Sequence, residues 1–230
     1  MRPGLVALTA LIACGCAKFP DTGGVGATTR LVFTMEVDRQ IRSGRNTGEN
    51  GLPYVYVVAI FLSKVDNPPE DGPLPVVSPG GNGIVAGQCS HFVMFYPPQG
   101  PDYQIWEFRD ATLNERFPKG IPIQTTDVNP GSARIQFEID LSQLVPLADV
   151  GAYRSAKVNF LTMNNTNTQG GGRVWDARGQ FPVQVNRPFT VPLRASRTFR
   201  NAQTDAVEGA GDCADPDLDI VDWTIEVRKL

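Results

Sequence analysis

Residues 133–141 read Ala-Arg-Ile-Gln-Phe-Glu-Ile-Asp-Leu, an unbroken alternation of apolar and polar side chains. Successive side chains of a β-strand point to opposite faces, so this pattern buries one face of a strand and leaves the other in water. Residues 28–38 and 221–227 alternate in the same way. The three segments predict half-buried strands, as in sheets that pack through one face, and we expect the last to lie inside its sheet.

Residues 53–64, which read PYVYVVAIFLSK, form the most apolar stretch after the N-terminal segment. Both alternating sets of side chains are apolar, and β-branched residues are frequent. This composition is typical of a strand that is covered on both faces. We therefore expect residues 53–64 to form a central strand.

Turn-forming residues set the overall class. The chain has 23 glycines and 19 prolines, which disfavour long helices, and only residues 142–150 suggest a single helical turn. The proline-rich residues 65–83 predict a surface excursion or binding loop. Further strands are expected at residues 89–96, 103–109, 156–163, 181–185 and 189–193, the first two forming a hairpin. The sequence predicts an all-β fold: one antiparallel β-sandwich over residues 28–230, immunoglobulin-like or jelly-roll-like, with about nine or ten strands.

The N-terminus has the layout of a secretory signal peptide. Arg2 precedes an uncharged, mainly apolar run that ends in small residues, and this run is shorter than the about 20 residues that cross a bilayer. Leu11-Ile12-Ala13-Cys14 resembles the lipobox of bacterial lipoproteins. The resemblance implies that residues 1–13 are a signal peptide and that Cys14 is lipidated, with Cys16 as second choice. The small, polar and glycine-bearing residues that follow predict a flexible tether, so that residues 14–27 hold the lipidated cysteine and the tether. Plain secretion, with both cysteines inside the removed signal, is the alternative.

The same resemblance implies an exported protein anchored in a membrane by fatty chains such as palmitate, facing the periplasm or the cell exterior. An Asp after the lipidated cysteine would resemble an inner-membrane retention mark, and the residue here is Gly15. The outer membrane is therefore favoured if the cell is Gram-negative. A net charge of −3 gives no reason to expect nucleic acid as a partner. No motif in residues 28–230 resembles a known family.

Two cysteines remain outside the N-terminal segment, Cys89 and Cys213. In an oxidising compartment they are expected to form a disulfide, and the alternative is two free, buried thiols. Neither belongs to a Cys-x-x-Cys pattern, so the sequence gives no support for a zinc or redox motif.

The acidic run Asp212, Asp215, Asp217, Asp219 and Asp222 is the sharpest local feature of the chain. Carboxylate oxygens suit Ca²⁺, and the alternating Asp215, Asp217 and Asp219 suggest a calcium site. The run departs from an EF-hand loop, because Ile220 stands where that loop needs Gly and no helices flank it. The alternative is a set of solvated acids that lead into a strand.

Residues 164–176 are the best candidate for a ligand-binding surface. Asn164, Asn165, Trp175 and Asp176 combine amides, an aromatic ring and a carboxylate beside a glycine-rich segment. Such groups are suited to binding a carbohydrate. The alternative is that Trp175 packs on the core.

The sequence offers little for catalysis. His91, the one histidine, lies in mid-strand without a Gly-x-Ser-x-Gly motif, so we expect it to be packed in the sheet. Arg187, Arg194, Arg197 and Arg200 form a mild basic cluster, expected to be a solvated face or, alternatively, to contact lipid headgroups. The predicted function is a lipid-anchored binding or scaffold protein of the bacterial envelope, with a carbohydrate or an envelope protein as partner. The alternatives are a carboxylate-dependent hydrolase and a structural subunit of an envelope assembly.

Overall fold

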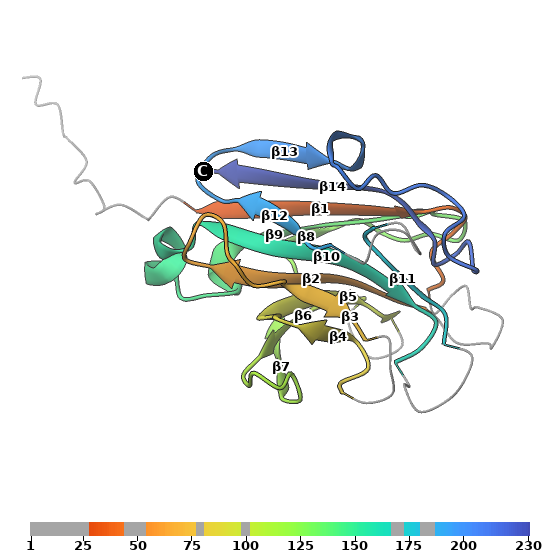
Figure 1. The fold of residues 1–230 in the computed structure, drawn as a ribbon, viewed down its shortest axis with the longest axis horizontal. Coiled ribbons are helices and arrows are strands. Elements are labelled where there is room, and N and C mark those ends of the chain that lie inside the picture. Colours follow the sequence, from red (N-terminus) through yellow and green to blue (C-terminus); the bar gives the residue numbers. More distant parts are fainter. Residues whose placement is uncertain (1–27, 44–53, 77–80, 98–101, 167–172, 180–186) are drawn as a thin grey trace, which may run out of the picture.

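A computed structural model describes residues 28–43, 54–76, 81–97, 102–166, 173–179 and 187–230 (Figure 1). Within them the chain folds into fourteen strands and three short 3-10 helices, and every strand pair is antiparallel. The 3-10 helices are η2 (Leu141–Gln143), η3 (Leu147–Ala152) and η4 (Asn201–Gln203). No helix among the described residues is long and apolar enough to cross a membrane.

Two sheets pack face to face (Figure 1). The five-stranded sheet has the order β13 (Arg197–Arg200), β14 (Ile220–Lys229), β1 (Thr29–Val37), β9 (Arg134–Asp140), β8 (Gln124–Thr125). In the seven-stranded sheet, β11 (Trp175–Ala177) and β12 (Phe189–Pro192) both pair with β10 (Ser155–Met163), followed by β2 (Val55–Ser63), β5 (His91–Phe95), β6 (Tyr103–Phe108) and β7 (Arg116–Gly120). The predicted β-sandwich is confirmed.

Alternating apolar residues form the core between the sheets. Phe33 of β1 and Trp223 of β14 are fully buried, as the alternation of their strands predicts. Phe160 of β10 lies 5.5 Å from the Trp223 ring and 6.5 Å from the Phe33 ring, so these aromatic contacts cross from one sheet to the other. The strand over residues 221–227 lies inside its sheet, between β13 and β1, as expected.

The outer face of the seven-stranded sheet is also covered. Val55, Val57 and Ala59 of β2 belong to a second buried cluster on this face, so the strand predicted at residues 53–64 is indeed covered on both sides. Part of the cover is a hairpin of β3 (Pro73–Pro75) and β4 (Val85–Gly87), from within and just after the proline-rich segment. Asn159 of β10 donates a hydrogen bond of 2.9 Å to the Pro73 carbonyl and ties the hairpin to the sheet.

The expected number of strands was nine or ten. The structure adds six strands of two to five residues, namely β3, β4, β7, β8, β11 and β13. Strands this short carry too few residues to show an alternation. The strand expected at residues 181–185 lies outside the described residues, as do Cys14, Cys16 and the whole of residues 1–27.

The Cys89–Cys213 disulfide is a prediction that the structure corrects, because both thiols are free. Cys89 belongs to the cluster on the outer face of the seven-stranded sheet, and its sulfur lies 3.1 Å from the His91 carbonyl oxygen. Cys213 packs against the core between the sheets, and its sulfur lies 3.7 Å from the Trp175 carbonyl oxygen. The two residues pack on opposite sides of one sheet, and burial raises the pKa of each thiol to about 12.

The sandwich has two distinct ends. At the terminal end, the Leu230 amide donates to the Thr28 carbonyl at 2.9 Å, so the described chain begins and ends at one place. Strand β14 starts at the opposite end, where β11 and the chain that precedes β14 lie, and ends here (Figure 1). Ten strand residues span roughly 30 Å.

Candidate metal centre

Asp176 ties the two sheets together at the end opposite the termini. It lies in β11, at the edge of the seven-stranded sheet, and is 5% exposed. Its carboxylate accepts hydrogen bonds of 2.7 Å from the backbone amides of Ala177 and Ile220. Ile220 begins β14 of the other sheet, beside a register shift in the pairing of β1 with β14. The shift breaks the regular ladder and leaves the Ile220 amide available to Asp176.

Asp219, the residue before β14, organises the turn that precedes it. Its carboxylate, which is almost fully buried, accepts hydrogen bonds from the Gly211 amide at 2.6 Å and the Cys213 amide at 3.1 Å. Gly211 has a φ of +99°, which a residue with a side chain rarely adopts. Asp219 thus fixes the turn that carries Asp212.

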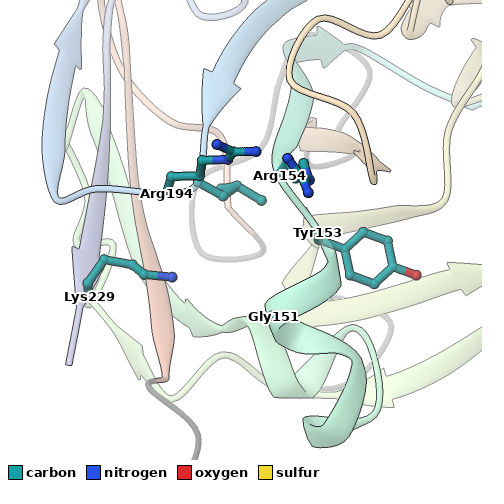
Figure 2. A pocket seen from close by; sticks show the side chains of 6 residues that line it. Gly151, Tyr153, Arg154, Arg194 and Lys229 are labelled. Atoms are coloured by element: carbon teal, nitrogen blue, oxygen red, sulfur yellow. The ribbon is translucent and has the colours of Figure 1, made fainter.

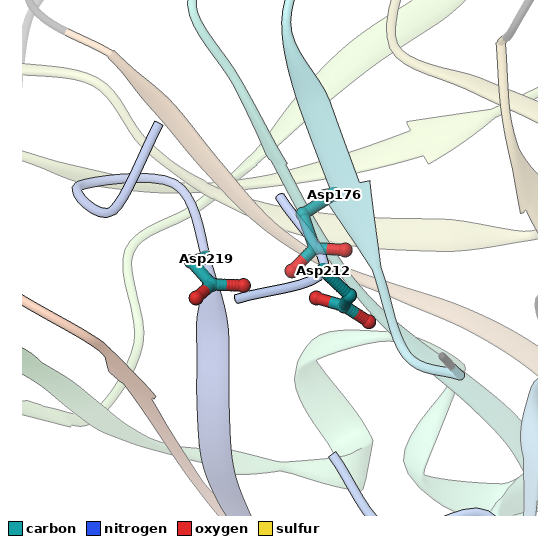
Figure 3. A group of neighbouring side chains, drawn as sticks. All are labelled: Asp176, Asp212 and Asp219. Carbon is teal, nitrogen blue, oxygen red and sulfur yellow. The ribbon is translucent and has the colours of Figure 1, made fainter. Parts of the chain in front are cut away.

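The result is a cluster of three carboxylates from three segments of the chain (Figure 3). One oxygen each of Asp176, Asp212 and Asp219 lies within 4.8 Å of the other two. Asp176 and Asp219 are buried, and Asp212 is partly exposed. We call these three residues the carboxylate cluster.

Burial and the neighbouring carboxylates make the ionised forms of Asp176 and of the nearby Glu208 costly, although the buried guanidinium of Arg178 lowers the pKa of Glu208. Burial raises the pKa of Asp176 to about 8, against the effect of the Ile220 hydrogen bond, and the charge of Asp212 raises it further. Glu208 lies close by and is 3% exposed, and burial together with Asp212 raises its pKa to about 7. Oε1 of Glu208 accepts a hydrogen bond from the Gly179 amide, and Oε2 has no hydrogen-bond partner within the described part of the chain. Several buried carboxylates near one another are costly in their ionised form unless a cation balances them, and otherwise they tend to take up protons.

The donor set fits a hard divalent cation. All donors are oxygens, which Ca²⁺ prefers, and Ca²⁺ binds oxygen at 2.3–2.6 Å. Two oxygens on opposite sides of one Ca²⁺ are therefore about 5 Å apart at most. The separations within the carboxylate cluster respect this limit. Backbone carbonyls and water would complete the coordination, because Ca²⁺ takes six to eight ligands.

The predicted calcium residues Asp215, Asp217 and Asp219 are not brought together. Residues 215–219 form a turn, in which the Leu218 and Asp219 amides both donate to the Asp215 carbonyl. Asp215 accepts from the Tyr54 hydroxyl at 2.6 Å, and Asp217 pairs with Arg42 at 2.5 Å. Of the predicted set, only Asp219 belongs to the cluster.

The predicted ligand surface is also divided. Asn164 accepts hydrogen bonds from the Val174 amide and from the Asn165 side chain, so it supports the connection between β10 and β11. Trp175 is partly buried against the cluster on the outer face of the seven-stranded sheet. Asp176 is the one of the four predicted residues that joins the carboxylate cluster.

Two acids of this site were missed as site residues. Asp212 lies in the acidic run that the sequence displays, directly after Gly211, so a signal existed. Glu208 is surrounded by small and apolar residues in the sequence, and nothing local distinguishes it.

His91 is packed within the sheet, as expected. It is 4% exposed, and burial lowers its pKa to about 4. Its Nδ1 lies 3.0 Å from the Ser90 hydroxyl, which itself donates to the Ile60 carbonyl and accepts from the Leu62 amide. The Ser90 hydroxyl is hydrogen-bonded to backbone groups and is not placed to act as a nucleophile.

Comparison with known proteins assigns no family. The chain matches no protein-family model, no curated protein and no solved structure.

Proposed function

We propose that this protein is a lipid-anchored binding or scaffold protein of the bacterial cell envelope, with a calcium ion held by Asp176, Asp212 and Asp219. The observation that carries the calcium part is the convergence of three carboxylates, from β11, a turn and the start of β14, within 4.8 Å of one another. Two of the three are buried, and such groups are rarely left without a counter-charge.

The anchor part rests on the lipobox around Cys14 and agrees with the placement of the termini. A chain leaving Thr28 towards Cys14 starts at the terminal end, and the carboxylate cluster lies at the opposite end. A tether there would hold the terminal end near the membrane and turn the cluster away from it. A calcium ion bound at that outward end would fix the turns around Asp212 and leave their outer surface free for a carbohydrate or a protein of the envelope.

The test is a calcium titration of the full chain in a neutral detergent, by calorimetry and by thermal melting. We expect stoichiometric binding of one Ca²⁺. At a calcium concentration 100 times Kd, the bound ion should raise the melting temperature by about 5–10 °C over an EDTA control. No heat of binding and an unchanged melting temperature would refute the calcium site.

The informative variant is Asp212→Asn, because Asp212 is partly exposed and its replacement removes one charge with little change in shape. It should weaken calcium binding more than tenfold, at least as much as the loss of a group that only orients a metal ligand. The matched control is Asp222→Asn, an exposed acid on β14 outside the cluster, which should bind calcium like the parent protein. Equal affinities in the two variants would place the ion elsewhere.

A carboxylate-dependent hydrolase is the second candidate. The raised pKa values of Asp176 and Glu208 favour it, because a general acid must keep its proton near neutral pH. However, Asp176 is 5% exposed, and both of its oxygens accept backbone hydrogen bonds. A substrate could reach this carboxyl only if β11 moved, so we place binding before hydrolysis.

A further inference from the structure

A pocket of about 450 Å³ opens at the terminal end, remote from the carboxylate cluster (Figure 2). It is lined by Gly151, Tyr153, Arg154, Leu193, Arg194 and Lys229. These residues come from η3 and the chain after it, from the chain after β12 and from the end of β14. Three of these six residues carry a positive charge, and none of the six is acidic.

The backbone beneath the two arginines is fixed. The Arg154 amide donates to the Ser63 carbonyl at the end of β2, and the Leu193 amide donates to the Arg154 carbonyl at 2.8 Å. The Lys229 ammonium donates to the Thr29 hydroxyl at 2.7 Å, which holds this third cation at the start of β1. The three cations therefore project from paired strands and their immediate ends, a rigid base for an anion site.

One acid lies close to the two arginines. The Asp66 carboxylate is 3.0 Å from Nε of Arg194 and 3.8 Å from Arg154. All three side chains are about half exposed, so these pairs are weak and exchangeable. Asp66 shows that the two guanidinium groups can share one anionic group. It balances only one of the three positive charges of the pocket.

We propose that this pocket binds a phosphate group through Arg154, Arg194 and Lys229. Guanidinium forks match the oxygens of phosphate, and an ammonium adds a point charge. The phosphate has two candidate sources, a free phosphate compound or the headgroup of an anionic phospholipid. The lipid source rests on the proposed anchor: thirteen residues lie between Cys14 and Thr28, and a flexible chain of that length spans roughly 20 Å.

A lipid source also agrees with the electrostatics of such an arrangement. Anionic headgroups attract basic groups that come within a Debye length of the surface, about 8–10 Å. The anchor would keep the terminal end near that distance, and the pocket would then hold the phosphate of one headgroup with a net negative charge, which phosphatidylcholine lacks because its choline neutralises the phosphate. A pocket for a free phosphate compound needs no anchor.

The experiment is a calorimetric titration of the full chain in a neutral detergent with three probes. These are inorganic phosphate, a short-chain phosphatidylglycerol below its micelle concentration and the matching phosphatidylcholine. Saturable binding of phosphatidylglycerol alone supports the pocket with a lipid source. Saturable binding of inorganic phosphate as well as, or instead of, phosphatidylglycerol supports it with a free phosphate compound as ligand. Binding of neither, or equal binding of phosphatidylcholine and phosphatidylglycerol, overturns the proposal.

Variants of the pocket residues test whether the binding takes place in the pocket. Arg194→Gln and Arg154→Gln should each weaken binding about tenfold, because each removes charge-assisted hydrogen bonds. Arg200→Gln removes the same charge from an exposed site on β13 outside the pocket, and should leave binding unchanged. Asp66→Asn should tighten binding roughly threefold, because the competing carboxylate is lost.

A further variant blocks the pocket without removing any contact. A Cβ added at Gly151 would meet no atom within 4 Å, so we expect the fold to tolerate Gly151→Glu, which adds a negative charge to the pocket wall. It should reduce binding at least tenfold at unchanged melting temperature. Unaltered binding in Gly151→Glu and in Arg194→Gln would overturn the pocket as the site. Inorganic phosphate is tested separately from lipid, so phosphate binding to the pocket can be measured even if Cys14 proves not to be lipidated.

Discussion

At the scale of single residues, the partner decides what each aspartate of the acidic run does. Asp217 is neutralised by Arg42 at 2.5 Å and also accepts from the Gln40 amide. Asp219, two residues later, accepts hydrogen bonds from the Gly211 and Cys213 amides and lies beside Asp176 and Asp212. The alternation of aspartates in the sequence could not distinguish the role of Asp217 from that of Asp219, because both roles depend on residues far away in the chain.

His91 predicts a measurable acid sensitivity. Its folded pKa of about 4 lies below the ordinary 6.5, so the unfolded chain binds the proton more tightly. The stability that the neutral imidazole contributes is complete above about pH 6.5 and is lost as the pH falls towards 4. Between pH 7 and pH 5 this loss amounts to about 2 kcal/mol. It should be absent in His91→Gln, which has no titrating group at this position.

The measurement is the free energy of unfolding by denaturant at both pH values in the two proteins. The comparison between proteins is needed because Asp176 and Glu208 act in the opposite direction. Their raised pKa values mean that protonation between about pH 8 and pH 4 stabilises the fold. The same pH dependence in His91→Gln and the parent would show that His91 is not the responsible group.

At the scale of elements, the long alternating strands could be predicted and the short ones could not. Strands β1, β9 and β14 have seven to ten residues and display their period of two. Strand β11 has three residues, yet it supplies Asp176 to the carboxylate cluster. Its place beside the start of β14 follows from sheet packing, which no local pattern encodes. This is why the acidic run suggested Asp215 and Asp217 as partners of Asp219, whereas the structure places Asp176 and Asp212 beside it.

The turn before β14 is held by an ion pair that is separate from the cluster. Asp217 is 3% exposed, and Arg42 follows the end of β1. Asp217→Asn should lower the free energy of unfolding by about 1–3 kcal/mol, because a buried charged hydrogen bond is lost. Calcium affinity should stay within about twofold of the parent value, since Asp217 is not in the carboxylate cluster. Denaturant unfolding with EDTA and a calcium titration measure the two quantities. A calcium affinity that falls together with stability would restore Asp217 as a ligand.

At the scale of the whole molecule, the two candidate sites lie at opposite ends of the sandwich and have opposite charge. Three acids gather at one end, and three basic residues line the pocket at the terminal end. The sheets between them are held by aromatic contacts such as Phe160 with Trp223. The β class and the central strand followed from composition and alternation. The placement of the carboxylate cluster and of the basic pocket at opposite ends could not be predicted from the sequence, because it depends on which loops meet in the folded chain.

The anchor gives a prediction at this scale. Cys14→Ser removes the thiol that the lipobox would lipidate, and a single change there should move the protein from the membrane fraction to the soluble fraction. Cys16→Ser is the matched control and should stay in the membrane fraction. Fractionation of cells that express each variant measures the effect. Retention of Cys14→Ser in membranes that also hold the control would contradict lipidation at Cys14.

Terbium luminescence tests the calcium site most directly, because Tb³⁺ replaces Ca²⁺ and accepts excitation energy from a nearby tryptophan. Trp175 directly precedes Asp176 in β11, and Trp223 lies in β14 four residues beyond Asp219. We predict terbium emission on tryptophan excitation in the full chain, competed by Ca²⁺, unchanged in Asp222→Asn and strongly reduced in Asp212→Asn. The absence of sensitised emission, or equal emission from both variants, would contradict a metal ion at Asp176, Asp212 and Asp219.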